Sequence, residues 1–318
     1  MELQTKVKLP NPDFTIDHQH SLLSIGSCFS ENIGRKFNYL KFNIQVNPFG
    51  QQYNPLSVAA GIERLLRNKE YTTNDLIFHN ELYHSFDHHS DFSSANEVDA
   101  LQHINQAFRK SAHALLHANY LFLTFGTAHY FEHIESSKIV SNCHKFPSKT
   151  FHQKLATPNE IVDALNTALL ALMEVNPKLK VIFTVSPVRY FAFGHFENSL
   201  SKAHLFTAIG ELLANNAAFS YFPAYEIIMD ELRDYRFYAD DMIHPNAIAI
   251  EYVWEKLVQY YFNSNTISIN KEIEDIQKIT HHRPRNENSI AHQKLLDNCK
   301  LKIEALKQNH NIDFSHSL

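Results

Sequence analysis

Short apolar segments alternate with longer amphipathic segments along most of this chain. The apolar runs predict five strands, at 22–25, 42–46, 120–125, 180–185 and 225–229. Stretches with the helical period lie between and after them, at 31–40, 56–67, 98–117, 158–174 and 198–216. Strands that alternate with helices of this length form a parallel sheet with helices on both faces. We therefore predict a three-layer α/β/α domain that binds ligands at the carboxyl ends of its strands.

Three regions depart from this alternation. The stretch at 129–140 is typical of an inserted hairpin, and the polar and aromatic stretch at 71–96 predicts a loop-rich excursion. Near the end, helical patterns at 271–279 and 290–309 flank a charged break at 281–286. We therefore expect one α/β domain at 1–264 and a helical extension at 265–318. The extension is expected to pack on the sheet domain or on another subunit, so that homo-oligomers can form through it.

Composition narrows the class of protein. The chain has 318 residues and a net charge of -5 without a basic cluster, which argues against a nucleic-acid partner. No apolar run approaches the roughly 20 residues that a membrane-spanning helix needs. The first residues lack the apolar core of a signal peptide, and the 3 cysteines are too scattered for a disulfide framework. We expect a cytoplasmic protein.

The 21 histidines raise the question of a metal site. They are densest at His18/His20, His88/His89 and His281/His282. None of these pairs lies beside cysteines at zinc-finger spacing, and none forms His-Glu-x-x-His. We expect neither a bound metal nor an organic cofactor, and a histidine-rich metallohydrolase is a competing hypothesis that metal analysis would test.

The segment Gly26-Ser27-Cys28-Phe29-Ser30 joins the first predicted strand to the first predicted helix. Backbone N–H groups at a helix N-terminus and the helix dipole both favour negative charge there. Such a turn suits a nucleophile that must become an anion, and Ser27 and Cys28 are the two candidates. Residue type alone favours Ser27.

A second motif, Asp240-Asp241-Met242-Ile243-His244-Pro245, precedes a helix expected at 247–262. Asp241 and His244 are three residues apart, so one turn can present both side chains to the same point. In a hydrolytic triad the carboxylate orients the imidazole, whose other nitrogen takes the proton of the nucleophile. The alternative hypothesis is an ordinary capping turn, since Asp and His are common where helices begin.

The combination of these two motifs resembles the SGNH (GDSL-type) hydrolases. More specifically, the chain is similar to the GSCFA family, a branch of that superfamily, over roughly residues 20–263. Further segments that match in order are 47–50, 53–57, 123–128, 142–145, 184–189, 197–202 and 221–245. The resemblance implies an SGNH-hydrolase-like (flavodoxin-like) sheet with a C-terminal helical extension.

The resemblance also implies catalytic roles. It places Cys28 at the nucleophile position, with Ser27 as the alternative, His244 as the base and Asp241 as the carboxylate that orients it. A thiol at a helix N-terminus beside a histidine is expected to have a lowered pKa. No cofactor is implied.

The oxyanion hole departs from the superfamily pattern. The resemblance implies that the backbone N–H groups of Gly50 and Cys28 stabilise the oxyanion. Ala128 stands where the superfamily has an asparagine, and losing one such donor typically lowers the rate by roughly 10²–10³. Asn142 or else Asn198 is the expected replacement.

Other matched residues are expected to bind substrate, namely Gly126, His144 and Arg189. Arg189 follows a strand end, where it can bind a substrate carboxylate or hydroxyl groups or form a salt bridge within its own loop. The resemblance implies an esterase-like hydrolase or acyltransferase acting on a small-molecule or glycan acyl ester, or a thioester, through an acyl-enzyme. The alternative is a non-catalytic module that holds a glycan or an acylated ligand, which the alanine at 128 motivates.

Overall fold

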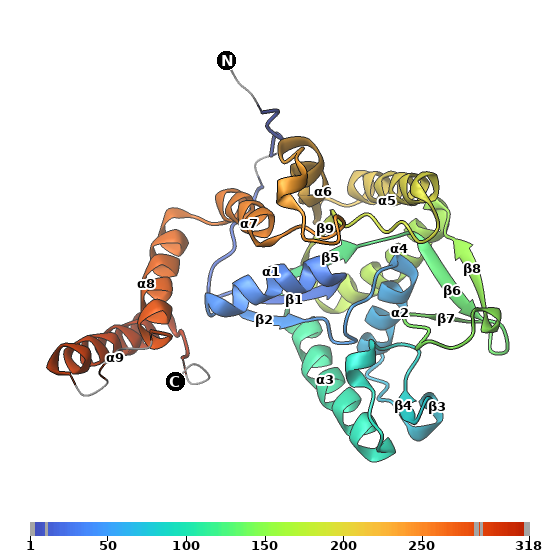
Figure 1. Cartoon of the computed structure of the whole chain (residues 1–318), viewed down its shortest axis with the longest axis horizontal. Coiled ribbons are helices and arrows are strands. Elements are labelled where there is room, and N and C mark those ends of the chain that lie inside the picture. Colours follow the sequence, from blue (N-terminus) through green and yellow to red (C-terminus); the bar gives the residue numbers. More distant parts are fainter. Residues whose placement is uncertain (1–3, 10–11, 283–285, 287–288, 315–318) are drawn as a thin grey trace.

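The computed structural model describes residues 4–9, 12–282, 286 and 289–314. Its centre is a five-stranded parallel sheet in the order β10-β9-β5-β1-β2 (Figure 1). The strands are β1 (Ser21–Gly26), β2 (Asn43–Val46), β5 (Tyr120–Phe125), β9 (Lys180–Val185) and β10 (Phe219–Tyr221). Four of the five predicted strands are thereby confirmed.

Successive residues of a strand point to opposite faces of the sheet. The central strands are apolar on both faces, so helices cover both. Leu23 and Ile25 of β1 belong to the core under α2 (Pro55–Leu66), α3 (Glu97–His117), α4 (Pro158–Val175) and α5 (His195–Asn215). Leu22 belongs to the opposite core, under α1 (Cys28–Tyr39) and α7 (Ala247–Tyr261). The predicted three-layer α/β/α architecture is confirmed.

The prediction of a strand at 225–229 is wrong. The fifth strand is β10, and the chain from α6 (Ala224–Glu226) through Ile227–Glu231 is helical. The backbone N–H of Ile227 donates to the carbonyl of Pro223 at 3.0 Å, which closes a helical turn. A short apolar run has no periodicity that separates a buried strand from a buried helix, so the pattern could not decide.

The two excursions form small accessory elements. The predicted hairpin at 129–140 is present as β6 (His129–His133) and β7 (Lys138–Val140), and an unpredicted strand, β8 (Phe151–Leu155), pairs with the other edge of β6. The stretch at 71–96 is mostly irregular, with a hairpin of β3 (Ile77–His79) and β4 (Leu82–His84).

The C-terminal helices are α8 (Ser264–Thr280) and α9 (Ile290–His310), which lie at the end of the molecule away from β6, β7 and β8 (Figure 1). Gln277 of α8 donates to the carbonyl of Tyr39 at the end of α1, at 3.1 Å. The extension therefore packs on the sheet domain. Part of the charged break predicted at 281–286 lies outside the described residues. Among the helices that the structure describes, none is long and apolar enough to cross a membrane.

Candidate active site

The nucleophile turn forms where β1 ends and α1 begins. A Cβ on Gly26 would lie 2.3 Å from the carbonyl oxygen of Thr124 on the neighbouring strand β5, so only glycine fits at this position. Ser27 caps α1, and its Oγ accepts a hydrogen bond from the backbone N–H of Phe29 at 3.3 Å. Ser27 is buried, at 2% exposure, whereas Cys28 is partly exposed at the first helical position. The structure thus gives the two candidates different environments.

The thiol of Cys28 responds to opposing influences. Burial raises its pKa, and this outweighs the backbone N–H groups of Phe29 and Cys28 and the charge of Lys202, which lower it. The expected lowering of the Cys28 pKa is therefore wrong, and this pKa is raised. The thiol is protonated at neutral pH and needs a base.

The Asp241–His244 turn has the predicted geometry. The Oδ2 atom of Asp241 lies 2.6 Å from Nδ1 of His244, and Oδ1 accepts the backbone N–H groups of Ile243 and His244, both at 2.9 Å. These hydrogen bonds, the backbone ones first, lower the pKa of Asp241 to about 2. Because the carboxylate can only accept, Nδ1 is the ring nitrogen that donates to it, and in the neutral imidazole the lone pair is therefore on Nε2.

Ser27, Cys28 and His244 line the same cavity, of about 430 Å³. Gly126 lines it too, and most of the remaining wall is apolar or aromatic: Tyr53, Phe131, Val140, Val188, Tyr190 and Phe193. The structure therefore brings two motifs from opposite ends of the chain to one apolar chamber.

The expected oxyanion residues do not reach this cavity. The backbone N–H of Gly50 donates to the carbonyl of Asn47 at 2.8 Å, and Gly50 lines a different cavity with Glu31 and Gln51. The prediction that Gly50 offers its N–H beside Cys28 is wrong, because the turn at 47–50 uses that N–H internally.

The predicted replacements lie elsewhere as well. The side chain of Asn142 accepts from the backbone N–H of His144, and the buried His144 ring contacts the carbonyl of Ser85. Asn198 is buried within α5, where it accepts from Arg189 at 3.3 Å. Neither asparagine nor His144 lines the cavity of Cys28.

Asn54 is the asparagine that does line the cavity, and the sequence interpretation missed it. Its Oδ1 caps α2 by accepting the backbone N–H of Ser57 at 2.8 Å, and its Nδ2 donates to the Ser57 hydroxyl at 3.0 Å. An amide nitrogen carries two hydrogens, so one remains for a second acceptor. The Asn54-Pro55 pair was a visible helix-start signal, although nothing in it indicated a cavity.

Lys202 is a second residue that the interpretation missed. It is buried, at 2% exposure, and its Nζ donates to the carbonyls of Gly126 at 2.8 Å and Ser186 at 2.7 Å. Burial, helped by the charge of Arg189, lowers the pKa of Lys202 to about 7. This lysine joins the carboxyl ends of β5 and β9 beneath the chamber.

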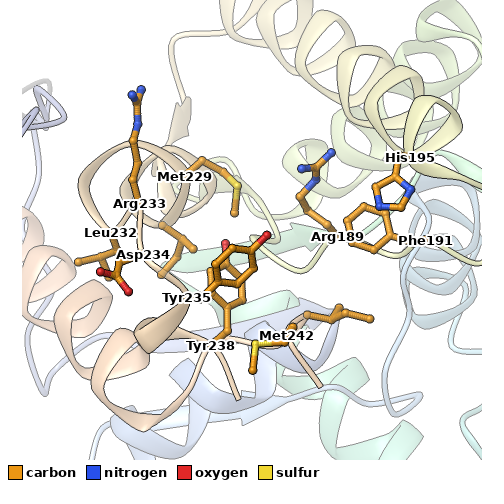
Figure 2. A pocket seen from close by; sticks show the side chains of 12 residues that line it. Arg189, Phe191, His195, Met229, Leu232, Arg233, Asp234, Tyr235, Tyr238 and Met242 are labelled. Carbon is orange, nitrogen blue, oxygen red and sulfur yellow. The ribbon is translucent and has the colours of Figure 1, made fainter. Parts of the chain in front are cut away.

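A second cavity, of about 280 Å³, adjoins the first, since Ile243 lines both. Figure 2 shows Arg189, Phe191 and His195 on one side and residues of the 229–234 segment on the other. Tyr235, Tyr238 and Met242 complete the labelled lining. Within the described residues, no group of three or more His, Cys, Asp or Glu side chains is arranged to hold a metal ion.

Comparison with known proteins gives the family. The model described as "GSCFA family" matches residues 21–257, and that of the "GSCFA domain protein, C-terminal domain" matches residues 273–318. No curated protein sequence matches significantly. A family 3 carbohydrate esterase of Clostridium thermocellum superposes with 9% identity and a TM-score of 0.36, over 79% of this chain and 97% of that one.

An acetyl xylan esterase of the rumen bacterium Butyrivibrio proteoclasticus superposes with 11% identity and a TM-score of 0.38, over 81% of this chain and 66% of that one. Structural similarity at this level is too low to indicate an activity for this chain. The family models cover most of the sequence, and the resemblance first seen in the motifs is confirmed. The chain belongs to the GSCFA family.

Proposed function

We propose that this protein is an esterase-like hydrolase or acyltransferase that acts on an ester or thioester through a covalent acyl-enzyme on Cys28. One observation carries the proposal: Cys28 and the hydrogen-bonded His244–Asp241 pair line the same cavity. A nucleophile, a base and a carboxylate that orients the base are the parts that acyl transfer requires.

In the proposed reaction, Nε2 of His244 takes the proton of the Cys28 thiol as Sγ attacks the carbonyl carbon. The carbonyl π electrons move to oxygen, and the tetrahedral intermediate collapses by expelling the alcohol or thiol, which takes the proton from His244. Water or an acceptor alcohol then attacks the thioester carbonyl while Nε2 of His244 takes its proton. The second tetrahedral intermediate collapses, the C–S bond breaks, and His244 returns the proton to Sγ of Cys28 as the acid or new ester leaves. Asp241 stabilises the imidazolium in both halves.

For the oxyanion we propose two donors, of which the first was already expected and the second replaces Gly50. One is the backbone N–H of Cys28 at the first position of α1, where helix N–H groups have no partner within the helix. The other is the second hydrogen on Nδ2 of Asn54. The apolar wall of the chamber suits the acyl half of the substrate.

Ser27 is the alternative nucleophile, and its environment argues against that role. Its hydroxyl caps α1 and is buried, so attack would cost the helix its cap. We also propose that residues 1–264 form the catalytic unit and 265–318 an appendage. A cytoplasmic location, the absence of a nucleic-acid partner and assembly through the C-terminal helices stay predictions.

The test measures hydrolysis of p-nitrophenyl butyrate and of butyryl thiocholine by the intact chain and by three variants. Cys28→Ala and His244→Ala should lose at least 10³-fold in kcat, in line with removal of a triad member. Ser27→Ala should keep its kcat and lose roughly 1 kcal/mol of stability with the cap. Cys143→Ala is the matched control, a partly exposed thiol outside the cavity.

An active Cys28→Ala protein, together with an inactive Ser27→Ala protein that folds, would move the nucleophile to Ser27. A second candidate function is a non-catalytic ligand-binding module, which the occupied N–H of Gly50 and the alanine at 128 favour. It is supported if the intact chain binds butyrate esters without hydrolysing them and the Cys28→Ala protein binds them equally well.

A further inference from the structure

Arg189 differs from the other arginines of the described chain in having no acidic partner. Each of the others has a carboxylate oxygen within 4 Å: Arg35, Arg64, Arg67, Arg109, Arg233 and Arg236. Arg189 instead donates from Nε to Oδ1 of Asn198 at 3.3 Å and from Nη2 to Oγ of Ser199 at 3.4 Å. These neutral partners hold the guanidinium in place without neutralising it.

Arg189 is partly buried, and its side chain lines the second cavity (Figure 2). Its charge lies 5.1 Å from the centre of the Phe191 ring, which fixes its orientation further. The charge of Arg189 also lowers the pKa of Tyr238, although burial raises that pKa overall. A cation held this way, with no carboxylate beside it, is prepared for an anion from outside the protein.

The other charged side chains that line this cavity do not neutralise Arg189. Arg233 is paired with Asp230 at 2.8 Å. Asp234, the carboxylate among the lining residues, accepts the backbone N–H of Arg236 at 2.8 Å and lies 3.7 Å from its guanidinium. Among the described residues that line this cavity, Arg189 is therefore the charged side chain without an oppositely charged partner.

The position of this cavity relates it to the proposed chemistry. His244 lines the first chamber and Met242 the second, while Ile243 between them lines both. The leaving alcohol takes its proton from His244, so the alcohol half of a substrate must lie next to the 242–244 segment. With the acyl half bound in the apolar chamber, the alcohol half extends past the 242–244 segment toward the second cavity, which Arg189 lines.

We propose that the substrate is an apolar acyl ester of an alcohol that carries an anionic group, a phosphate or a carboxylate, bound by Arg189. This inference rests on the proposed function for the direction in which the substrate lies. The recognition of the anion by Arg189 can be measured without any turnover.

The experiment compares three hexanoyl esters: monohexanoylglycerol, hexanoylglycerol 3-phosphate and the hexanoyl ester of glyceric acid. The intact chain should hydrolyse at least one anionic ester with a kcat/KM roughly 10- to 100-fold above that of the neutral ester, the range of a hydrogen-bonded charge. Arg189→Met should remove this preference, because it should lower kcat/KM for the anionic ester roughly 10- to 100-fold more than kcat/KM for the neutral ester. Arg189→Lys should recover part of it. Arg109→Met is the matched control, an exposed arginine on α3.

Binding separates this inference from the proposed reaction. In a Cys28→Ala background, calorimetry should show tighter binding of one anionic ester than of monohexanoylglycerol, and Arg189→Met should abolish the difference. That result without hydrolysis by the intact chain would support the anion site and refute the proposed function. Equal affinities for all three esters, or an Arg189→Met effect of equal size on each, would overturn the inference. The phosphate and carboxylate arms identify which anion is bound.

Discussion

The carboxylate of Asp241 contacts His244 twice, through the ring Nδ1 at 2.6 Å and through the backbone N–H at 2.9 Å. One side chain therefore sets both the fold of this turn and the tautomer of the imidazole. About half of each side chain is exposed to solvent, so the pair depends on these hydrogen bonds and not on burial for its geometry.

Asp241→Asn should therefore lower kcat by roughly 10²–10⁴, because an amide no longer stabilises the imidazolium and can favour the wrong tautomer. The measurement is ester hydrolysis between pH 6 and 9. Asp240→Asn, at the exposed neighbouring position, is the control and should stay within about two-fold of the natural protein. A kcat for Asp241→Asn within three-fold of the natural value would contradict the assigned role.

Lys202→Met should slow alkylation of Cys28 by iodoacetamide at pH 6, where Lys202, with a pKa of about 7, still carries its charge. The charge of Lys202 lowers the pKa of the Cys28 thiol, so its removal raises that pKa and reduces the thiolate fraction. The rate is followed by mass spectrometry in a Cys143→Ala/Cys299→Ala background. Lys154→Met, on the exposed surface of β8, should leave the rate unchanged.

Lys202→Met also removes the hydrogen-bond donor of the carbonyls of Gly126 and Ser186. Its thermal unfolding must therefore be recorded, and alkylation is compared well below the midpoint. An unchanged alkylation rate in folded Lys202→Met protein would show that this lysine is only a structural link.

Asn54→Ser should lower kcat by roughly 10²-fold while the chain stays folded. Serine also caps a helix, so α2 keeps its N-terminal hydrogen bond, but the Nδ2 donor is lost. The check is kcat on p-nitrophenyl butyrate together with the unfolding midpoint. Asn96→Ser, which changes the cap of α3 in the same way away from the chamber, is the control. Equal losses of activity in both variants would refute the oxyanion role.

The apolar chamber predicts a dependence on acyl chain length. From acetyl to hexanoyl p-nitrophenyl esters, kcat/KM should rise roughly four-fold per methylene, since each buried CH₂ contributes about 0.8 kcal/mol. Val188→Phe, which fills part of the cavity, should flatten this series and spare the acetyl ester. Val175→Phe, exposed at the end of α4, should not. A flat series for the natural protein would place the acyl group elsewhere.

Acid should destabilise the protein below about pH 6.5. Burial lowers the pKa of His88 to about 3 and that of His144 to about 4, from 6.5 in the unfolded chain. Between pH 6.5 and 4 the unfolded state therefore binds protons that the folded state does not, and the free energy of unfolding falls as pH falls. Each such histidine contributes at most about 1.4 kcal/mol per pH unit.

Urea unfolding at pH 7, 6 and 5 measures this slope. His88→Phe removes one titrating ring from a site where Phe49, Tyr71 and Phe92 surround it, and should make the slope shallower. His113→Gln, on the exposed face of α3, should leave it unchanged. The same slope in all three proteins would mean that other groups control acid unfolding.

Local sequence was enough for the parts of the site that lie within one turn. Asp241 and His244 are three residues apart, so their contact follows from chain geometry alone. The strand-to-helix turn at Gly26 was equally predictable, because this glycine ends the mainly apolar run at 22–25. The sheet followed from alternation, apart from the run at 225–229, where length and composition suit either structure.

The remaining parts depend on tertiary contacts that no local pattern encodes. Whether the N–H of Gly50 is free depends on how the 47–50 turn closes. The burial of Lys202 depends on α5 crossing the ends of two strands, and the unpaired state of Arg189 on where every carboxylate comes to rest. Asn54 could be recognised as a cap, but not as part of a cavity wall.

The sheet order places β1 between β5 and β2, while the base follows β10 at the opposite edge. Because Cys28 precedes His244 by more than 200 residues, it leaves the ribosome long before His244 is synthesised. The strand β1 also cannot complete its pairing until β5 has been synthesised. During synthesis the thiol exists without its base, so a nascent or truncated chain should carry no acyl-transfer activity. The proposed catalysis begins only after nearly the whole sheet domain has been translated.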